Sequence, residues 1–147
     1  MDDFTAKPGY PNMYGLVQGE ANKIEPKKRM LSSMSPTLVE QNGEFEGALG
    51  TPGGSTIITS VLQVVLNKID YRMTLPEALE AGRFHHQWLP DSIYCEKKYF
   101  PETVLNELRR RGFAVSQVDR LADIQAIWRS GDRWEICSDP RGTGTPV

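Results

Sequence analysis

The segment from Gly50 to Ser55 reads Gly-Thr-Pro-Gly-Gly-Ser and leads directly into an apolar stretch that begins at Ile57. Adjacent glycines let backbone N–H groups approach a ligand closely, and a following helix start adds partial positive charge. The segment therefore predicts an anion site made of backbone, suited to a phosphate, a carboxylate or a developing oxyanion. The alternative is that Gly53 and Gly54 only turn the chain from a strand into a helix, and spacing alone does not decide between them.

Nucleotide-binding motifs do not fit this glycine turn. Gly54 is not followed by the Lys-Ser or Lys-Thr pair of a phosphate-binding loop, and the glycine spacing departs from the dinucleotide fingerprint. We therefore expect no cofactor. The chemical interpretation that remains is an oxyanion hole.

Two further groups of polar residues could bind a ligand. Asp2 and Asp3 could hold a cation or an amine, although an acidic pair at this position can also be simply solvated. Ser32 and Ser33 lie in a hydroxyl-rich turn that could bind a carboxylate, because hydroxyl and N–H donors can converge on a carboxylate without burying a second charge. The alternative is an ordinary serine-rich turn. No Gly-x-Ser-x-Gly elbow surrounds these serines, which disfavours a serine hydrolase of the usual type.

The histidines and cysteines give weaker signals. His85 and His86 are the only histidines, and adjacent residues of an extended segment point to opposite faces. No metal partners can be placed beside them, so we expect a hydrogen-bonded structural role and no metal site. Cys95 and Cys137 are too few for a disulfide framework and too far apart for a zinc knuckle, and we expect both to be small buried residues.

Composition limits the class of protein. The 147 residues, 39% hydrophobic and 24% charged, match one globular domain with its own core. The net charge of -2 gives no field suited to nucleic acid, so no nucleic-acid partner is expected. The longest apolar stretch, Ile57 to Ile69, is interrupted by polar residues, so we expect no membrane segment.

The periodicity of the chain predicts an α+β fold. Residues 1–30 are rich in proline and glycine and predict an extended, turning segment, whereas residues 31–147 carry the sheet and the helices. Two helices should cover one face of a largely antiparallel sheet, which leaves the other face for something outside the chain and favours self-association. We expect strands at 37–40, 44–49, 93–96, 113–118, 124–128 and 133–137, and helices at 57–69, 74–81 and 101–111.

Several blocks of sequence follow one another in an ordered series. They are Met1-Asp2-Asp3-Phe4, Ala6-Lys7-Pro8-Gly9, Lys28-Arg29, Leu31 to Thr37, Pro52 to Ser55, Ile69-Asp70-Tyr71, Arg83 to Pro90 and Ser138-Asp139-Pro140-Arg141. Together they resemble the γ-glutamyltransferases (γ-glutamyl transpeptidases), in the C-terminal part of the small subunit. The resemblance runs from Met1 to about Gly142.

This resemblance implies a fold, an activity and residue roles. The fold is the αββα sandwich of N-terminal nucleophile hydrolases, in which a threonine exposed by self-cleavage attacks the γ-glutamyl amide of donors such as glutathione. Asp3 matches the residue that binds the α-amino group of the donor. Ser32 and Ser33 match the pair that holds its α-carboxylate, and Gly53 and Gly54 match the oxyanion-hole glycines.

The resemblance also implies what this chain lacks. The nucleophilic threonine lies upstream of the position matched by Met1, so we expect the isolated chain to be inactive. Its partners would be the rest of the small subunit and the large subunit, in a periplasmic or extracellular parent enzyme. Two alternatives remain open: an inactive binding or assembly module on the same scaffold, and a related amidohydrolase acting on acylated β-lactams or poly-γ-glutamate.

Overall fold

The structure is a computed structural model that describes residues 3–144. Asp2, one member of the acidic pair considered above, lies outside the described residues, as do Met1 and residues 145–147. Residues 3–30 are irregular: they hold one short 3-10 helix, η1 (Glu20–Asn22), and two isolated bridges that join Thr5 to Lys23 and Pro11 to Val17.

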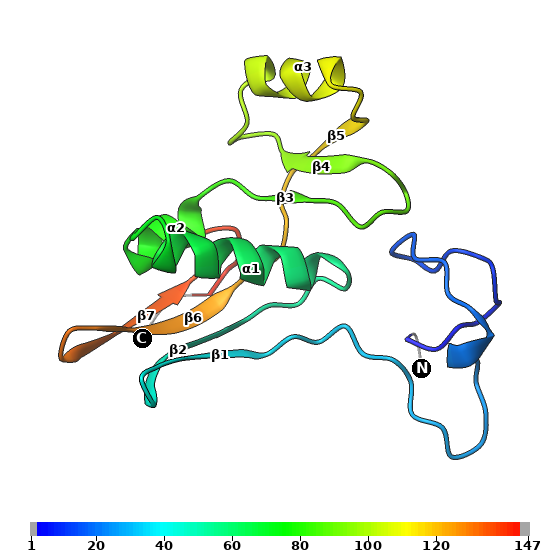
Figure 1. Ribbon diagram of the computed structural model, residues 1–147, viewed down its shortest axis with the longest axis horizontal. Helices are drawn as coiled ribbons and strands as arrows, with labels where there is room; N and C mark the ends of the chain where they lie inside the picture. Colours follow the sequence, from blue (N-terminus) through cyan, green and yellow to red (C-terminus); the bar gives the residue numbers. More distant parts are fainter. Residues whose placement is uncertain (1–2, 145–147) are drawn as a thin grey trace.

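Most of the predicted strands belong to one antiparallel sheet in the order β1-β2-β6-β7 (Figure 1). The predicted hairpin is confirmed, since β1 and β2 pair across a turn in which Asn42 and Gly43 both have positive φ. The four strands of this sheet are β1 (Thr37–Gln41), β2 (Glu44–Gly50), β6 (Gln125–Ser130) and β7 (Arg133–Ser138).

The remaining strands form a second, smaller sheet in the order β3-β4-β5, so the single sheet expected from the sequence is divided. The pairing of β4 with β5 is parallel, because α3 (Glu102–Arg110) connects them as a crossover helix. The strands are β3 (Phe84–His85), β4 (Ile93–Glu96) and β5 (Val115–Val118), and β3 was not predicted.

Two helices, α1 (Thr56–Ile69) and α2 (Leu75–Glu80), lie on the same side of the four-stranded sheet (Figure 1). The predicted capping box starts α2: the Thr74 hydroxyl accepts from the Glu77 N–H, and the Glu77 carboxylate accepts from the Thr74 N–H. Burial of each large apolar side chain in this core contributes roughly 1.5–3 kcal/mol. The core residues are Leu49, Ile57, Val61, Val64, Leu75, Ala78, Leu79, Ile124, Ala126 and Trp128.

Two apolar surfaces of the described residues remain exposed. On the sheet face opposite the helices, Leu38, Ala48, Ile127 and Ile136 form a continuous row, because their registers place them side by side across all four strands. Leu38 is 77% exposed and Ile136 is 54% exposed. The helix α1 carries a broad apolar face, and the described residues cover only part of it. Its exposed apolar residues are Ile58, Leu62, Leu66 and Ile69.

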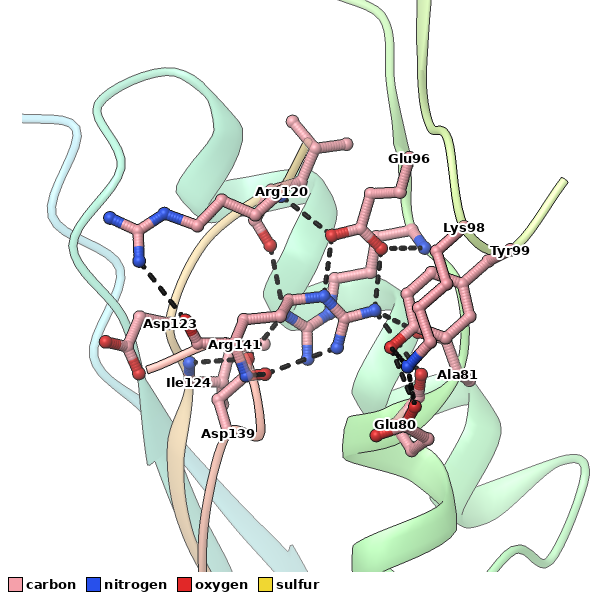
Figure 2. Close-up of polar contacts among 12 residues, drawn as sticks. Glu80, Ala81, Glu96, Lys98, Tyr99, Arg120, Asp123, Ile124, Asp139 and Arg141 are labelled. Carbon is pink, nitrogen blue, oxygen red and sulfur yellow. Dashed lines mark hydrogen bonds and ion pairs between the residues drawn. The ribbon is translucent and has the colours of Figure 1, made fainter. Parts of the chain in front are cut away.

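A buried network of four charged side chains joins the two sheets and the loop before β6. Arg141 forms a bidentate pair with Glu96, with both N···O distances at 2.6 Å, and also contacts Asp139 (Figure 2). Arg83 pairs with Asp139 and donates to the Leu121 carbonyl. Burial lowers the pKa of Arg83, although Asp139 opposes this. Burial also acts against the charged form of Arg141, but the bonds to Glu96 and Asp139 outweigh it and raise the pKa of Arg141.

Within residues 3–144, no helix is both long enough and apolar enough to cross a membrane.

Candidate functional site

The Gly53–Gly54 turn has a backbone that requires glycine at both positions. Gly53 has φ of 147° and Gly54 has φ of 57°, both in the region that side chains disfavour. A Cβ atom at Gly53 would lie 2.6 Å from the Thr56 hydroxyl, and one at Gly54 would lie 2.6 Å from the ring of Tyr14. The missing side chains therefore let Thr56 and Tyr14 approach the backbone directly.

The turn passes straight into α1, and its carbonyl groups take part in the first helical bonds. The Gly53 carbonyl accepts from the Thr56 N–H at 3.2 Å, and the Gly54 carbonyl accepts from the Ile57 N–H at 3.3 Å. The N–H groups of Gly53 and Gly54 donate to no acceptor within residues 3–144. Two unused donors at the positive end of a helix are what an oxyanion requires.

Thr51 fixes the entry to the turn. Its hydroxyl donates to the Pro52 carbonyl at 2.7 Å and accepts from the Asp123 N–H at 2.8 Å. Asp123 belongs to the loop that the buried charge network holds, because Leu121 and Ile124 on either side bond to Arg83, Glu96 and Asp139. A hollow of about 350 Å³ lies between this loop and the turn. Its lining residues are Pro52, Gly53, Thr56, Arg120, Leu121, Ala122 and Asp123.

The predicted head-group residues lie in the N-terminal segment and in the turn before β1. Asp3 and Ser33 are half-buried, and Ser32 is exposed with its hydroxyl accepting from the Met34 N–H. Among the hydrogen bonds of residues 3–144, none joins Asp3, Ser32 or Ser33 to the glycine turn. The structure therefore does not join the two halves of the predicted site by direct bonds.

One side chain, Asn22, links the two parts of the head-group set. Its Nδ2 donates to the Asp3 carbonyl and to Gln18 Oε1, each at 2.6 Å, and its Oδ1 accepts from the Leu31 N–H at 2.9 Å. Leu31 directly precedes Ser32. The side-chain amide of Asn22 thus bonds both to the Asp3 carbonyl and to the N–H of the residue before the serine pair.

Comparison with known proteins places this geometry in a family. The sequence profile described as "Gamma-glutamyltranspeptidase" matches residues 1–147. The chain belongs to the γ-glutamyltranspeptidase family. A curated relative, "Glutathione hydrolase proenzyme" of Escherichia coli (strain K12), is 51% identical over 143 residues, which is 96% of this chain and 24% of that protein. The chain therefore spans about a quarter of the length of this relative.

Solved structures of the γ-glutamyltranspeptidase family share the fold. The T380A mutant of Helicobacter pylori γ-glutamyltranspeptidase superposes with a TM-score of 0.91 at 47% identity, covering 97% of this chain and 78% of that chain. Cephalosporin acylase from Bacillus halodurans gives a TM-score of 0.77 at 26% identity, covering 86% of this chain and 24% of that chain. The mixed α/β arrangement with antiparallel sheets is thus that of γ-glutamyltranspeptidases and of related N-terminal nucleophile hydrolases.

The histidines of this γ-glutamyltranspeptidase chain are hydrogen-bonded. His85 is buried, with Nδ1 2.8 Å from the Thr59 hydroxyl and Nε2 2.9 Å from Gln87 Oε1. The exposed His86 lies 2.9 Å from an Asp91 carboxylate oxygen. These contacts agree with the structural role expected for the pair.

Both cysteines are free thiols, and their environments differ in part from the expectation. Cys95 is buried as expected, whereas Cys137 is only half-buried. Burial raises the pKa of Cys95, and burial together with Glu135 raises the pKa of Cys137.

Sequence reasoning missed four residues that organise the site: Tyr14, Asn22, Thr51 and Gln87. Each acts through contacts with residues distant in sequence, such as the 73-residue separation between Gln87 and Tyr14. A single amide or hydroxyl carries no spacing pattern of its own. The only available signal was that Tyr14 and Asn22 lie in a glycine-rich segment that needs partners to become ordered.

Proposed function

We propose that this chain supplies the donor-binding and oxyanion-hole residues of a γ-glutamyltransferase. The complete enzyme would cleave the γ-glutamyl amide of glutathione-like donors and transfer the group to water, amino acids or peptides through a threonyl ester. The observation that carries this proposal is the Gly53–Gly54 turn, whose two unused N–H groups stand at the start of α1. Such donors stabilise a tetrahedral oxyanion because they are already oriented before the reaction.

The head group of the donor would be held by residues of matching chemistry. The Asp3 carboxylate would bind the α-ammonium group, and the hydroxyls of Ser32 and Ser33 would bind the α-carboxylate. The link through Asn22 supports this assignment, because it fixes the backbone beside Asp3 and beside Ser32 relative to each other.

We further propose that the chain is the C-terminal part of a small subunit and packs against the rest of that protein in an αββα sandwich. The row formed by Leu38, Ala48, Ile127 and Ile136 supports this, because a sheet face this apolar is normally buried. The threonine nucleophile would come from the missing portion, and the parent would be periplasmic or extracellular.

The test is a release assay with a chromogenic γ-glutamyl anilide. The chain alone should release no chromophore, and the chain joined to the remaining portion of a γ-glutamyltransferase precursor should do so. Release by the chain alone would contradict the proposal. If the joined protein is inactive on the γ-glutamyl anilide, the inactive-module alternative is favoured. If it instead hydrolyses an acylated β-lactam or poly-γ-glutamate, the related-amidohydrolase alternative is favoured.

A further inference from the structure

The side chain of Gln87 makes four hydrogen bonds to four different residues. Its Oε1 atom accepts from the Ser55 hydroxyl at 2.6 Å and lies 2.9 Å from His85 Nε2. Its Nε2 atom donates to the carbonyl oxygens of Tyr14 at 2.9 Å and Leu89 at 3.0 Å. The primary amide therefore uses both of its N–H groups and both lone pairs of its oxygen.

These partners fix the orientation of the amide and the role of His85 Nε2. The carbonyl oxygens of Tyr14 and Leu89 can only accept, so the NH₂ group of Gln87 must face them. Its oxygen then faces His85, which makes His85 Nε2 a donor. The Thr59 hydroxyl lies 2.8 Å from His85 Nδ1 and 3.2 Å from the Thr56 carbonyl oxygen. Rotating the amide would place its oxygen against the carbonyl oxygens of Tyr14 and Leu89.

The contacts of Gln87 come from three separate parts of the chain that meet at the glycine turn. Ser55 follows Gly54 directly, and Tyr14 lies with its ring against Gly54, so both bonds end beside the same glycine. Gly15 strengthens the junction: a Cβ at this position would lie 3.3 Å from Pro90 and 3.7 Å from Gln87 Nε2. The N-terminal segment is thus docked on the loop that carries Gln87.

We propose that Gln87 is a positioning residue, which holds Tyr14 against Gly54 and ties both to the start of α1. The inference that this contact sets the direction of the oxyanion donors rests on the proposed function. Gln87 itself need not touch the substrate, because its bonds reach Gly54 only through Ser55 and Tyr14. Its effect is therefore expected on the rate of acylation rather than on binding of the donor.

The variant Gln87→Glu separates the two sides of the amide. It keeps an oxygen for Ser55 and His85 but places a second oxygen against the carbonyls of Tyr14 and Leu89, which breaks the link to the N-terminal segment together with the local bond to Leu89. The variant Gln87→Met removes all four bonds and keeps the length of the side chain.

The matched control is Gln63→Met. Gln63 also bridges α1 to β3, through bonds to the Thr59 carbonyl and to the backbone of Phe84, but none of its bonds reaches Tyr14.

Hydrogen exchange of this chain, followed by mass spectrometry, tests the positioning directly. In Gln87→Glu and Gln87→Met we expect amide exchange in residues 12–17 to become about tenfold faster, with faster exchange at 53–57 in the methionine variant. Gln63→Met should accelerate exchange at Phe84 and leave residues 12–17 unchanged. Unchanged exchange at 12–17 in both Gln87 variants, or equal acceleration by Gln63→Met, would overturn the proposal.

Single-turnover kinetics in a complete γ-glutamyltransferase polypeptide test the consequence for the reaction. Gln87→Glu should slow acylation ~10- to 100-fold while the KM for the donor changes less than about threefold. A raised KM with unchanged acylation would overturn the positioning role. If the complete wild-type polypeptide transfers no γ-glutamyl group, the proposed function fails, and the exchange experiment still decides whether Gln87 positions the turn.

Discussion

Replacing Arg141 with methionine should destabilise the fold strongly, because this arginine compensates a buried carboxylate. The side chain of Arg141 is 5% exposed and that of Glu96 is 0% exposed, and two N···O contacts of 2.6 Å join them. Removing one partner of a buried ion pair costs about 3–5 kcal/mol. In a domain of this size 1 kcal/mol shifts the melting temperature by about 2–4 °C, so Arg141→Met should lower Tm by roughly 10 °C.

The control is Arg110, whose solvent-exposed side chain pairs with a carboxylate in the same bidentate geometry. Arg110 also contacts both carboxylate oxygens of Glu107, at 2.7 Å each, but its side chain is 73% exposed. Arg110→Met should leave Tm within about 1 °C, because solvent screens exposed pairs. The Tm of Arg141→Lys should lie between those of Arg141→Met and Arg110→Met, because lysine keeps the positive charge but cannot form the bidentate pair. Scanning calorimetry measures all three, and equal melting of Arg141→Met and Arg110→Met would refute this reasoning.

Three further results are expected. Asn22→Asp, which cannot donate to the Asp3 carbonyl, should raise the KM for the donor about tenfold in a complete enzyme with little change in acylation; an unchanged KM would contradict it. Wild-type chain should self-associate in sedimentation velocity, and Leu38→Lys combined with Ile136→Lys should suppress this; a compact wild-type monomer at high concentration argues against an open face. Burial raises the pKa of the Cys95 thiol, so the thiol should resist alkylation at pH 8, and rapid labelling of the native protein would disprove this. The free energy of unfolding should fall as pH rises above the ordinary thiol pKa of about 8.5, because the folded state disfavours the thiolate.

The elements predicted best are those determined by local sequence. The Asn42-Gly43 turn, the capping box at Thr74 and the apolar spacing of residues 57–69 each have a short-range physical cause, and each element was found. The division into two sheets was not predictable in the same way, because strand pairing depends on contacts distant in sequence. The short strand β3 carries too few residues to show a periodicity.

The residues of the candidate site likewise fall into those that local sequence reveals and those that it does not. Gly53 and Gly54 could be recognised as a turn before a helix because adjacent glycines form a local pattern, and their positive φ angles show that the backbone requires glycine there. The pattern alone did not separate an oxyanion hole from a simple turn between a strand and a helix. Asn22 and Gln87 could not be recognised from the sequence, because a side-chain amide links distant segments only when the fold brings their polar groups within hydrogen-bond distance. The exposure of part of the apolar face of α1 could not be predicted either, since periodicity predicts an apolar face but not what covers it.

The most direct test of an oxyanion hole at this turn is the single-turnover acylation rate of Gly54→Ala in a complete γ-glutamyltransferase. A methyl group at Gly54 would lie 2.6 Å from the Tyr14 ring at a φ of 57°, so the turn must shift. Gly131→Ala is the control, because Gly131 has φ of 61° and no atom within 4 Å of the added Cβ. We predict that Gly54→Ala slows acylation ~10²- to 10³-fold relative to Gly131→Ala. Equal acylation rates in the two variants would contradict the account.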